Sequence, residues 1–229
     1  MELTLTPRLK AVAQQVTAGS RFADIGTDHA YLPVRLLLDG VVDWAIAADL
    51  REGPLARAKE TAERFAVTDK VSFRLCDGLT GIRAGEVDTV AIAGMGGETI
   101  AMILEAAPWT KDGVHLLLQP MTSFPDLRLW LQENGYRIES ETIAREGNRF
   151  YTIMSVRAGE MAPLTPAELW VGRQSEDPLR SAYLDYMGSK VARALEGQCA
   201  SQSRDEAAIA GLQEVLGGIT EMLKESVDL

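Results

Sequence analysis

Short apolar runs alternate with longer amphipathic stretches along the first 157 residues. The apolar runs have strand length and predict strands at residues 21–25, 44–48, 71–75, 89–93 and 115–118. The stretches between them predict helices at residues 31–38, 54–65, 98–106 and 124–134. An earlier helix is predicted near the N-terminus, where Thr6 is a typical N-cap and Pro7 suits the first helical position. The chain therefore begins as a repeated strand–helix unit.

Two further runs, residues 137–144 and 150–156, flank the turn sequence Glu146-Gly147-Asn148 and predict an antiparallel hairpin. Strand–helix repeats form parallel sheets with right-handed crossovers. Five such units closed by an antiparallel hairpin are the element order of class I methyltransferases, whereas an NAD-binding Rossmann domain more often ends in another parallel strand. We therefore predict an α/β fold with a Rossmann-like sheet of the class I methyltransferase type and a terminal antiparallel hairpin.

The pattern changes after residues 158–165, where Gly159, Pro163 and Pro166 predict a linker. Apolar residues then recur three and four positions apart in two series, namely Leu184, Met187, Val191 and Ala194, and Ile209, Leu212, Leu216, Ile219 and Leu223. Such narrow seams are typical of coiled coils, and the polar segment 197–205 suits a turn between them. We expect residues 1–160 to form a catalytic domain. Residues 161–229 are predicted to form a helical hairpin domain, which either contacts a partner or only packs against the core or a second copy.

Composition and charge limit the function classes. The 229 residues include two cysteines, Cys76 and Cys199, which match no metal or disulfide spacing and favour the reducing cytoplasm. The apolar runs are too short to cross a bilayer and the N-terminus lacks a signal pattern, so we expect no membrane partner and no export. The net charge of −10 lowers the expectation of a nucleic-acid partner without removing it, because local patches can still be basic. We expect a monomer or weak dimer with no metal.

Candidate chemistry follows the predicted strands, at the edge where open α/β sheets bind ligands. At or just after the ends of the five strands lie, in order, Asp24, Gly26, Asp28 and His29, then Asp49, then Asp77 and Gly78, then Gly94, Met95, Gly96 and Gly97, and last Gln119 and Pro120. Asp49 lies 25 residues after Asp24, an interval that suits a carboxylate accepting both ribose hydroxyls of a nucleoside. The spacing alone suits NAD, FAD and S-adenosylmethionine equally.

The loop after the first strand distinguishes between these ligands. Residues 23–33 read ADIGTDHAYLP, with one glycine and with Asp28 in the turn. A pyrophosphate dianion needs unobstructed backbone N–H groups and would be repelled by that carboxylate. S-adenosylmethionine carries a sulfonium, an ammonium and only one carboxylate, so acidic side chains suit it. The loop therefore favours S-adenosylmethionine.

Several of these residues also have a purely structural interpretation. Asp49 could cap the next helix, and Asp77 could serve only the Asp-Gly turn. His29 is either a general base or a side chain held by a neighbouring carboxylate to orient the loop. Tyr31 either stacks on a base or packs.

Four motifs together carry a family resemblance: ADIGTDHAYLP, DGL at 77–79, IAGMGGETI at 92–100 and LLLQP at 116–120. In these motifs the chain resembles the bacterial TrmK tRNA methyltransferases, which methylate N1 of adenine 22 of tRNA with S-adenosylmethionine. The resemblance runs from Arg8 to the FYTI sequence at 150–153, and the helical tail agrees with the family's coiled-coil domain. The family often has Ser at Thr27, Glu at Asp49 and Asn at Met121. Only the last difference affects expected polar contacts at the target base.

The resemblance implies cytoplasmic methylation of tRNA, with S-adenosylhomocysteine as product and an extruded adenine as acceptor. Asp28 is the candidate to stabilise the cationic product base. The expected catalytic residues are Asp28, His29, Tyr31, Gln119 and Pro120. The expected cofactor-binding residues are Asp24, Gly26, Thr27, Asp28, Asp49, Leu50, Asp77, Gly78, Ala93, Gly94, Met95 and Gly96. The expected RNA-binding residues are Arg8, Lys10, Arg35 and Arg128. A small-molecule methyltransferase and a non-catalytic S-adenosylmethionine-binding module remain alternatives.

Overall fold

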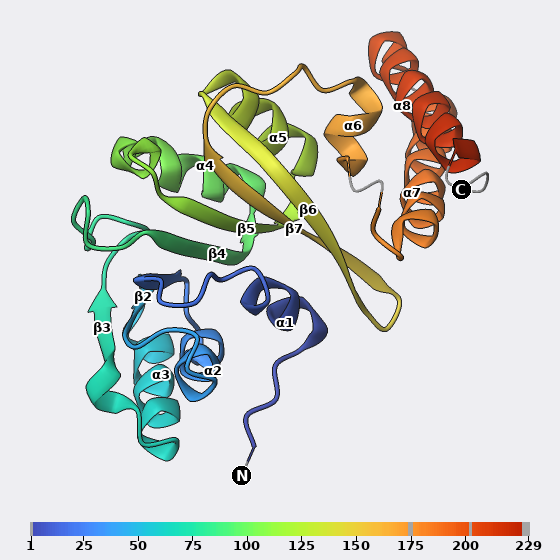
Figure 1. The fold of residues 1–229 in the computed structure, drawn as a ribbon. Helices are drawn as coiled ribbons and strands as arrows, with labels where there is room; N and C mark the ends of the chain where they lie inside the picture. Colours follow the sequence, from blue (N-terminus) through green and yellow to red (C-terminus); the bar gives the residue numbers. More distant parts are fainter. Residues whose placement is uncertain (1, 174–175, 202, 226–229) are drawn as a thin grey trace.

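A seven-stranded sheet forms the centre of the molecule (Figure 1), with the strand order β3-β2-β1-β4-β5-β7-β6. The computed structural model describes residues 2–173, 176–201 and 203–225. The parallel strands are β1 (Phe22–Ile25), β2 (Ala45–Asp49), β3 (Val71–Leu75), β4 (Thr89–Gly96) and β5 (His115–Thr122). An antiparallel hairpin of β6 (Tyr136–Glu146) and β7 (Arg149–Ala158) pairs with β5 through β7. The predicted class I methyltransferase fold is confirmed.

Helices cover both faces of the sheet. One face packs against α1 (Pro7–Ala13), α2 (Tyr31–Leu38) and α3 (Glu52–Arg64), and the other against α4 (Gly97–Glu105) and α5 (Phe124–Glu133). Short 3-10 turns, η1 (Thr68–Lys70) and η2 (Pro108–Lys111), precede β3 and β5. Successive side chains of a strand point to opposite faces, so Phe22 lies in the first core and Ala23 in the second. This double burial explains why the parallel strands are continuous apolar runs.

The last part of β4 differs from the prediction. The Gly94-Met95-Gly96 segment is not a loop, because the strand continues to Gly96 and β5 continues with it to Thr122. The register shifts between Ala93 and Met95, and Gly94 has a φ of +83°. The glycines therefore form an irregular strand end, which brings the backbone of β4 to the edge where the ligand site is expected.

The C-terminal residues form three helices, α6 (Pro166–Val171), α7 (Arg180–Ala200) and α8 (Glu206–Glu225). The two long helices pack through the predicted seams, with Leu184, Met187 and Val191 facing α8. The seam ends at Val191, because Ala194 is exposed, and α7 extends into the predicted turn as far as Ala200. Residue 202 of that turn lies outside the described residues. These helices share their core with Ile143 and Phe150 of the β6–β7 hairpin, and the domain boundary at residue 160 stays a prediction.

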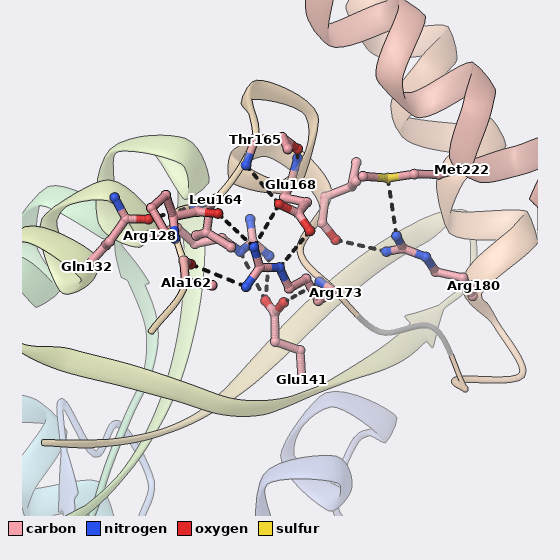
Figure 2. A network of polar contacts seen from close by, with 12 residues as sticks. Arg128, Gln132, Glu141, Ala162, Leu164, Thr165, Glu168, Arg173, Arg180 and Met222 are labelled. Atoms are coloured by element: carbon pink, nitrogen blue, oxygen red, sulfur yellow. Dashed lines mark hydrogen bonds and ion pairs between the residues drawn. The ribbon is translucent and has the colours of Figure 1, made fainter. Parts of the chain in front are cut away.

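A buried ion pair joins the tail to the sheet (Figure 2). Arg128 of α5 is fully buried, and its Nη2 and Nε donate to Glu141 Oε1 of β6 at 2.7 and 3.0 Å. Its Nη1 donates to the carbonyl of Leu169 in α6 at 2.8 Å, and the backbone N–H of Arg173 donates to the other oxygen of Glu141 at 2.9 Å. The expected contact of Arg128 with RNA is therefore wrong, because its guanidinium has no exposed surface.

We expect Arg128→Ala to lower the free energy of unfolding by about 3–5 kcal/mol, because it leaves the carboxylate of Glu141 buried without its partner. The matched control is Arg137→Ala, which breaks the exposed pair of Arg137 with Glu139 and should cost no more than about 1 kcal/mol. Urea unfolding of both variants measures the difference. Equal losses would show that the buried pair does not fix the tail.

Candidate active site

Two cavities lie at the carboxyl ends of the parallel strands and both are lined by Gly26. The smaller, of about 180 Å³, is lined by Asp49, Leu50, Arg51, Cys76, Asp77, Gly78, Met95, Thr99 and Ile103, besides Ile25 and Gly26. The larger, of about 360 Å³, is lined by Thr6, Arg8, Leu9, Asp24, Thr27, Asp28, His29, Ala30, Tyr31, Leu32, Ala93 and Gly94, besides Gly26. Of the twelve residues expected to bind cofactor, all but Gly96 line one of these cavities.

The smaller cavity has the features of a nucleoside site. Asp49 ends β2 and is 7% exposed, and its Oδ1 accepts the backbone N–H of Arg51 at 2.8 Å. The helix α3 begins at Glu52 with Arg51 as its N-cap residue, so Asp49 is not the helix cap. The turn after β3 uses the backbone carbonyl of Asp77, which accepts two hydrogen bonds from Thr80. The carboxylate of Asp49 is thus not explained by helix capping, and the carboxylate of Asp77 is not explained by the turn.

Glycine is required at two walls of these cavities. Gly26 has a φ of +77°, and a Cβ there would overlap the terminal methyl group of Met95. Gly78 has a φ of +52°, and a Cβ there would lie 2.9 Å from Ile103. Met95 and Ile103 therefore fill the space that side chains would take, and Met95 lies where the two cavities meet. Sequence reasoning missed Thr99 and Ile103 of α4 and Cys76, which follows β3, as lining residues, because residues of these ordinary types carry no local signal of a site.

The turn after β1 holds three candidate catalytic side chains at the mouth of the larger cavity. Asp28 is exposed and ion-paired with Arg57 of α3, and the hydrogen bond from Arg57 holds the pKa of Asp28 below its usual value. The Nε2 of His29 lies 3.6 Å from Asp28 Oδ2. The rings of His29 and Tyr31 stack at a centroid distance of 4.9 Å and an interplanar angle of 8°.

Backbone geometry sets this stack. Ala30, between the two rings, has a φ of +52°, a region that residues with a Cβ rarely adopt. The left-handed residue turns the chain into α2 and places His29 and Tyr31 side by side. Tyr31 is 38% exposed, so its ring forms an accessible apolar surface at the cavity mouth.

Gln119 lines neither of the two cavities. It is fully buried within β5, and its Oε1 accepts hydrogen bonds from the Gly94 N–H at 3.1 Å and from Arg8 Nη1 at 2.7 Å. Its Nε2 donates to the carbonyl of Pro120 at 2.6 Å. Pro120 is also buried and pairs with Met95 in the irregular end of β4. Both residues are predicted as catalytic, and neither of them lines a cavity.

Arg8 lies in the larger cavity instead of on the outer surface. Thr6 caps α1 through its hydroxyl, Pro7 begins the helix, and Arg8 is the second helical residue. Its backbone N–H donates to Glu146 of the hairpin at 2.9 Å, and its guanidinium lies 5.7 Å from the ring centroid of Tyr151. Its side chain thereby extends from α1 across the end of β4. Burial raises the pKa of Asp24, in the same cavity, to about 6, with Arg8 opposing and Asp49 adding to the rise.

The remaining expected RNA contacts, Lys10 and Arg35, line a separate surface cavity of about 350 Å³. Arg35 is ion-paired with Asp39 at 2.6 Å and donates to the carbonyl of Leu3 at 3.1 Å. Within the described part of the chain, no group of three His, Cys, Asp or Glu side chains is placed to hold a metal ion. Of the helices in those same ranges, none combines the length and apolar character needed to cross a membrane.

Comparison with known proteins agrees with this geometry. A methyltransferase domain model matches residues 5–154. The tRNA (adenine(22)-N(1))-methyltransferase of Bacillus subtilis (strain 168) is 39% identical over 160 residues, which are 69% of this chain and 67% of that protein.

Solved structures match over nearly the whole chain. The crystal structure of the B. subtilis M1A22 tRNA methyltransferase TrmK is 32% identical, with a TM-score of 0.79, covering 99% of this chain and 100% of that chain. A Streptococcus pneumoniae protein in complex with S-adenosyl-L-methionine is 34% identical, with a TM-score of 0.81 and coverage of 96% and 100%. M. capricolum TrmK in complex with S-adenosyl-homocysteine is 26% identical, with a TM-score of 0.78, covering 96% of this chain and 98% of that chain. The chain therefore belongs to the TrmK family of tRNA (adenine(22)-N(1))-methyltransferases.

Proposed function

We propose that this protein transfers the methyl group of S-adenosylmethionine to N1 of adenine 22 of tRNA, in the cytoplasm and as a monomer or weak dimer. The observation that carries the reaction type is the pair of cavities joined at Gly26, with Asp49 and Asp77 in one and Asp24 and Asp28 in the other. Acidic side chains in both cavities, on either side of Gly26, suit a cationic methyl donor. The names of the relatives support tRNA and the target position.

The chain's own residues suit the parts of this cofactor. The carboxylate of Asp49 accepts ribose hydroxyls, and Asp77 accepts the amino group of the adenine ring. Gly26 lines both cavities, so the middle of the bound cofactor passes this glycine. Bound S-adenosylmethionine supplies an electrophilic methyl group. The protein then has to orient the acceptor base, because N1 of adenine has a free lone pair and needs no deprotonation.

The acceptor base is placed by the loop after β1. The N1 edge of a paired adenine is inaccessible, so the base has to leave its stack before it reacts. The exposed ring of Tyr31, backed by His29, provides an aromatic surface for the extruded base at the cavity mouth. Arg57 lowers the pKa of Asp28, so the carboxylate stays ionised even in mildly acidic solution and can stabilise the cationic product base. Because Arg57 is ion-paired with the same carboxylate, it weakens the electrostatic stabilisation that Asp28 gives to the product base.

The tail contributes a contact surface for tRNA through α7. Arg145 lies over the ring of Phe150 at 5.3 Å, Phe150 contacts Tyr186 at 5.2 Å, and Lys190 lies over Tyr186 at 5.2 Å. This series runs from the hairpin tip to α7, and Arg193 lies exposed one turn beyond Lys190. Basic side chains interleaved with aromatic rings suit phosphates and bases together. In α8 four glutamates accompany a single lysine, so α8 is unsuited to phosphate.

The nucleoside product tests the proposed reaction. We expect incubation with labelled S-adenosylmethionine and bulk tRNA to yield label only in 1-methyladenosine after digestion. A tRNA transcript with guanosine at position 22 should take up none. Label in a different nucleoside would contradict the target atom. Cofactor binding without label in tRNA would favour the small-molecule methyltransferase or the non-catalytic module.

Tyr31 tests the stacking role. Tyr31→Ala removes the aromatic surface, and we expect kcat/KM for tRNA to fall by about 5- to 150-fold, the equivalent of ~1–3 kcal/mol per stacked base. Tyr31→Phe keeps the ring and should retain near wild-type kcat/KM. The dissociation constant of S-adenosylhomocysteine, measured by calorimetry, should be unchanged in both variants. Equal losses in the two variants would assign the role to the hydroxyl group instead.

Charge reversal on α7 tests the tRNA surface. We expect the double variant Lys190→Glu, Arg193→Glu to weaken tRNA binding at least several-fold and to reduce its dependence on salt, because two phosphate contacts are lost. The control is Lys224→Glu on α8, which should leave tRNA binding unchanged. Filter binding at several salt concentrations gives both quantities. An equal effect of the control would point to overall charge instead of a surface on α7.

A further inference from the structure

The separate cavity of about 350 Å³, which we call the α1–α2 cavity, continues along the same two helices that line the larger cavity. On α2, Leu32 lines the larger cavity, and Leu36, one turn further along, lines the α1–α2 cavity. Leu9 and Ala13 of α1 are related in the same way. Residues four apart lie on one face of a helix and about 6 Å apart along its axis. The two cavities are therefore successive positions along the same pair of helices.

The walls of the α1–α2 cavity are mostly apolar. Leu36 of α2 is buried, and Ala13 of α1 lies partly buried opposite the N-terminal segment 2–5, which closes the cavity. In this extended segment Leu3 is buried whereas Thr4 is exposed, as the alternation of side chains in an extended chain requires. A cavity of this volume with apolar walls suits one flat, unstacked nucleobase.

Lys10 is the cation that this cavity leaves available. Arg35 donates to both oxygens of Asp39 at 2.8 and 2.6 Å, and Glu2 lies 4.0 Å from it, so carboxylates already balance its charge. Arg35 also donates to the carbonyl of Leu3 at 3.1 Å and thereby holds the N-terminal segment against α2. The exposed ammonium of Lys10 makes no hydrogen bond or ion pair within residues 2–173, 176–201 and 203–225. A free ammonium beside an apolar cavity suits the phosphate of a nucleotide whose base lies inside.

We propose that the α1–α2 cavity binds the nucleotide next to the target adenine, with its base on the apolar walls and its phosphate at Lys10. This inference rests on the proposed function, in which Tyr31 supports the target base at the mouth of the larger cavity. Turning the target base out also removes a stacking partner from its neighbour, which then needs another apolar surface. Arg35 follows Tyr31 by one helical turn, so an extended strand with its target base at Tyr31 continues over the α1–α2 cavity.

A second nucleotide subsite determines which base is methylated. Tyr31 alone stacks on any base that is turned out, because every base has an aromatic face. A neighbour bound one turn along α2 fixes the register of the strand and so limits which nucleotide reaches Tyr31. None of the residues that line the α1–α2 cavity also lines either active-site cavity. The subsite therefore acts on the tRNA and leaves cofactor binding unaffected.

Two variants test this inference through the kinetics of tRNA methylation. Ala13→Leu fills the cavity, and Lys10→Ala removes its cation. We expect each to raise KM for tRNA by about 3- to 10-fold, the size of one exposed charged contact or part of a stacked base. The value of kcat and the dissociation constant of S-adenosylhomocysteine should stay within about twofold of wild type, which would also show that both variants are folded.

Two altered substrates separate the base from the phosphate. Each is a tRNA transcript with an abasic nucleotide on one side of adenine 22. We expect one of them to have a raised KM with the wild-type protein. On that transcript Ala13→Leu should add no further loss, because both changes remove the same contact, whereas Lys10→Ala should add its full loss, because the phosphate is still present.

The matched control is Lys70→Ala, an exposed lysine of η1 outside these cavities, which should leave KM unchanged. Unchanged KM in both cavity variants, or with both abasic transcripts, would overturn the inference. Full additivity of Ala13→Leu with each abasic transcript, or a raised KM in Lys10→Ala alone, would leave only a surface contact and refute the base subsite. A weaker affinity for S-adenosylhomocysteine would place the effect at the cofactor and also contradict the inference. If the wild-type protein methylates no tRNA at all, the proposed function fails instead.

Discussion

The buried pair of Arg128 and Glu141 constrains how the two parts of the molecule are joined. Neither charge reaches solvent, so the remaining N–H groups of the guanidinium need acceptors, and the carbonyls of Leu169 and Trp170 in α6 supply them. The position of α6 is therefore determined by α5 and β6. Because α7 packs on the same hairpin through Tyr183 and Tyr186, and α8 packs on α6 and α7, the tail is held in a definite orientation relative to the sheet.

The β6–β7 hairpin connects this tail to the active site. Neighbouring residues of a strand face opposite sides, so Phe150 packs against Tyr183 and Tyr186 of α7 while Tyr151 lies under Arg8 of α1. The tip residue Glu146 binds the backbone of Arg8 directly. The proposed tRNA surface on α7 and the side chain of Arg8 in the larger cavity are thus both positioned by one hairpin.

Local pattern was sufficient for the fold but not for the role of each polar residue. The strands were predictable because parallel strands are buried on both faces and read as apolar runs, and the acidic loop after β1 indicated a cationic ligand. The end of β4 was misjudged because glycines read as a break, whereas here they continue the strand through an irregular register. Arg128 and Arg8 were assigned to RNA because an exposed and a buried arginine look alike in sequence. Their partners Glu141 and Gln119 lie 13 and 111 residues away and only the fold brings them together.

The net charge of −10 is a poor guide to the substrate, because a sum over the chain does not show where the fold places each charge. Part of the acidity has a local use, because Asp24, Asp49 and Asp77 line the cavities for a cationic donor. Another part lies on α8, where four glutamates accompany a single lysine. The hairpin tip and α7 then present Arg145, Arg149, Lys190 and Arg193 as exposed cations. A polyanionic substrate responds to the charge within about a Debye length, ~8–10 Å, and not to the sum over the chain. An acidic protein of this design is therefore compatible with a tRNA substrate.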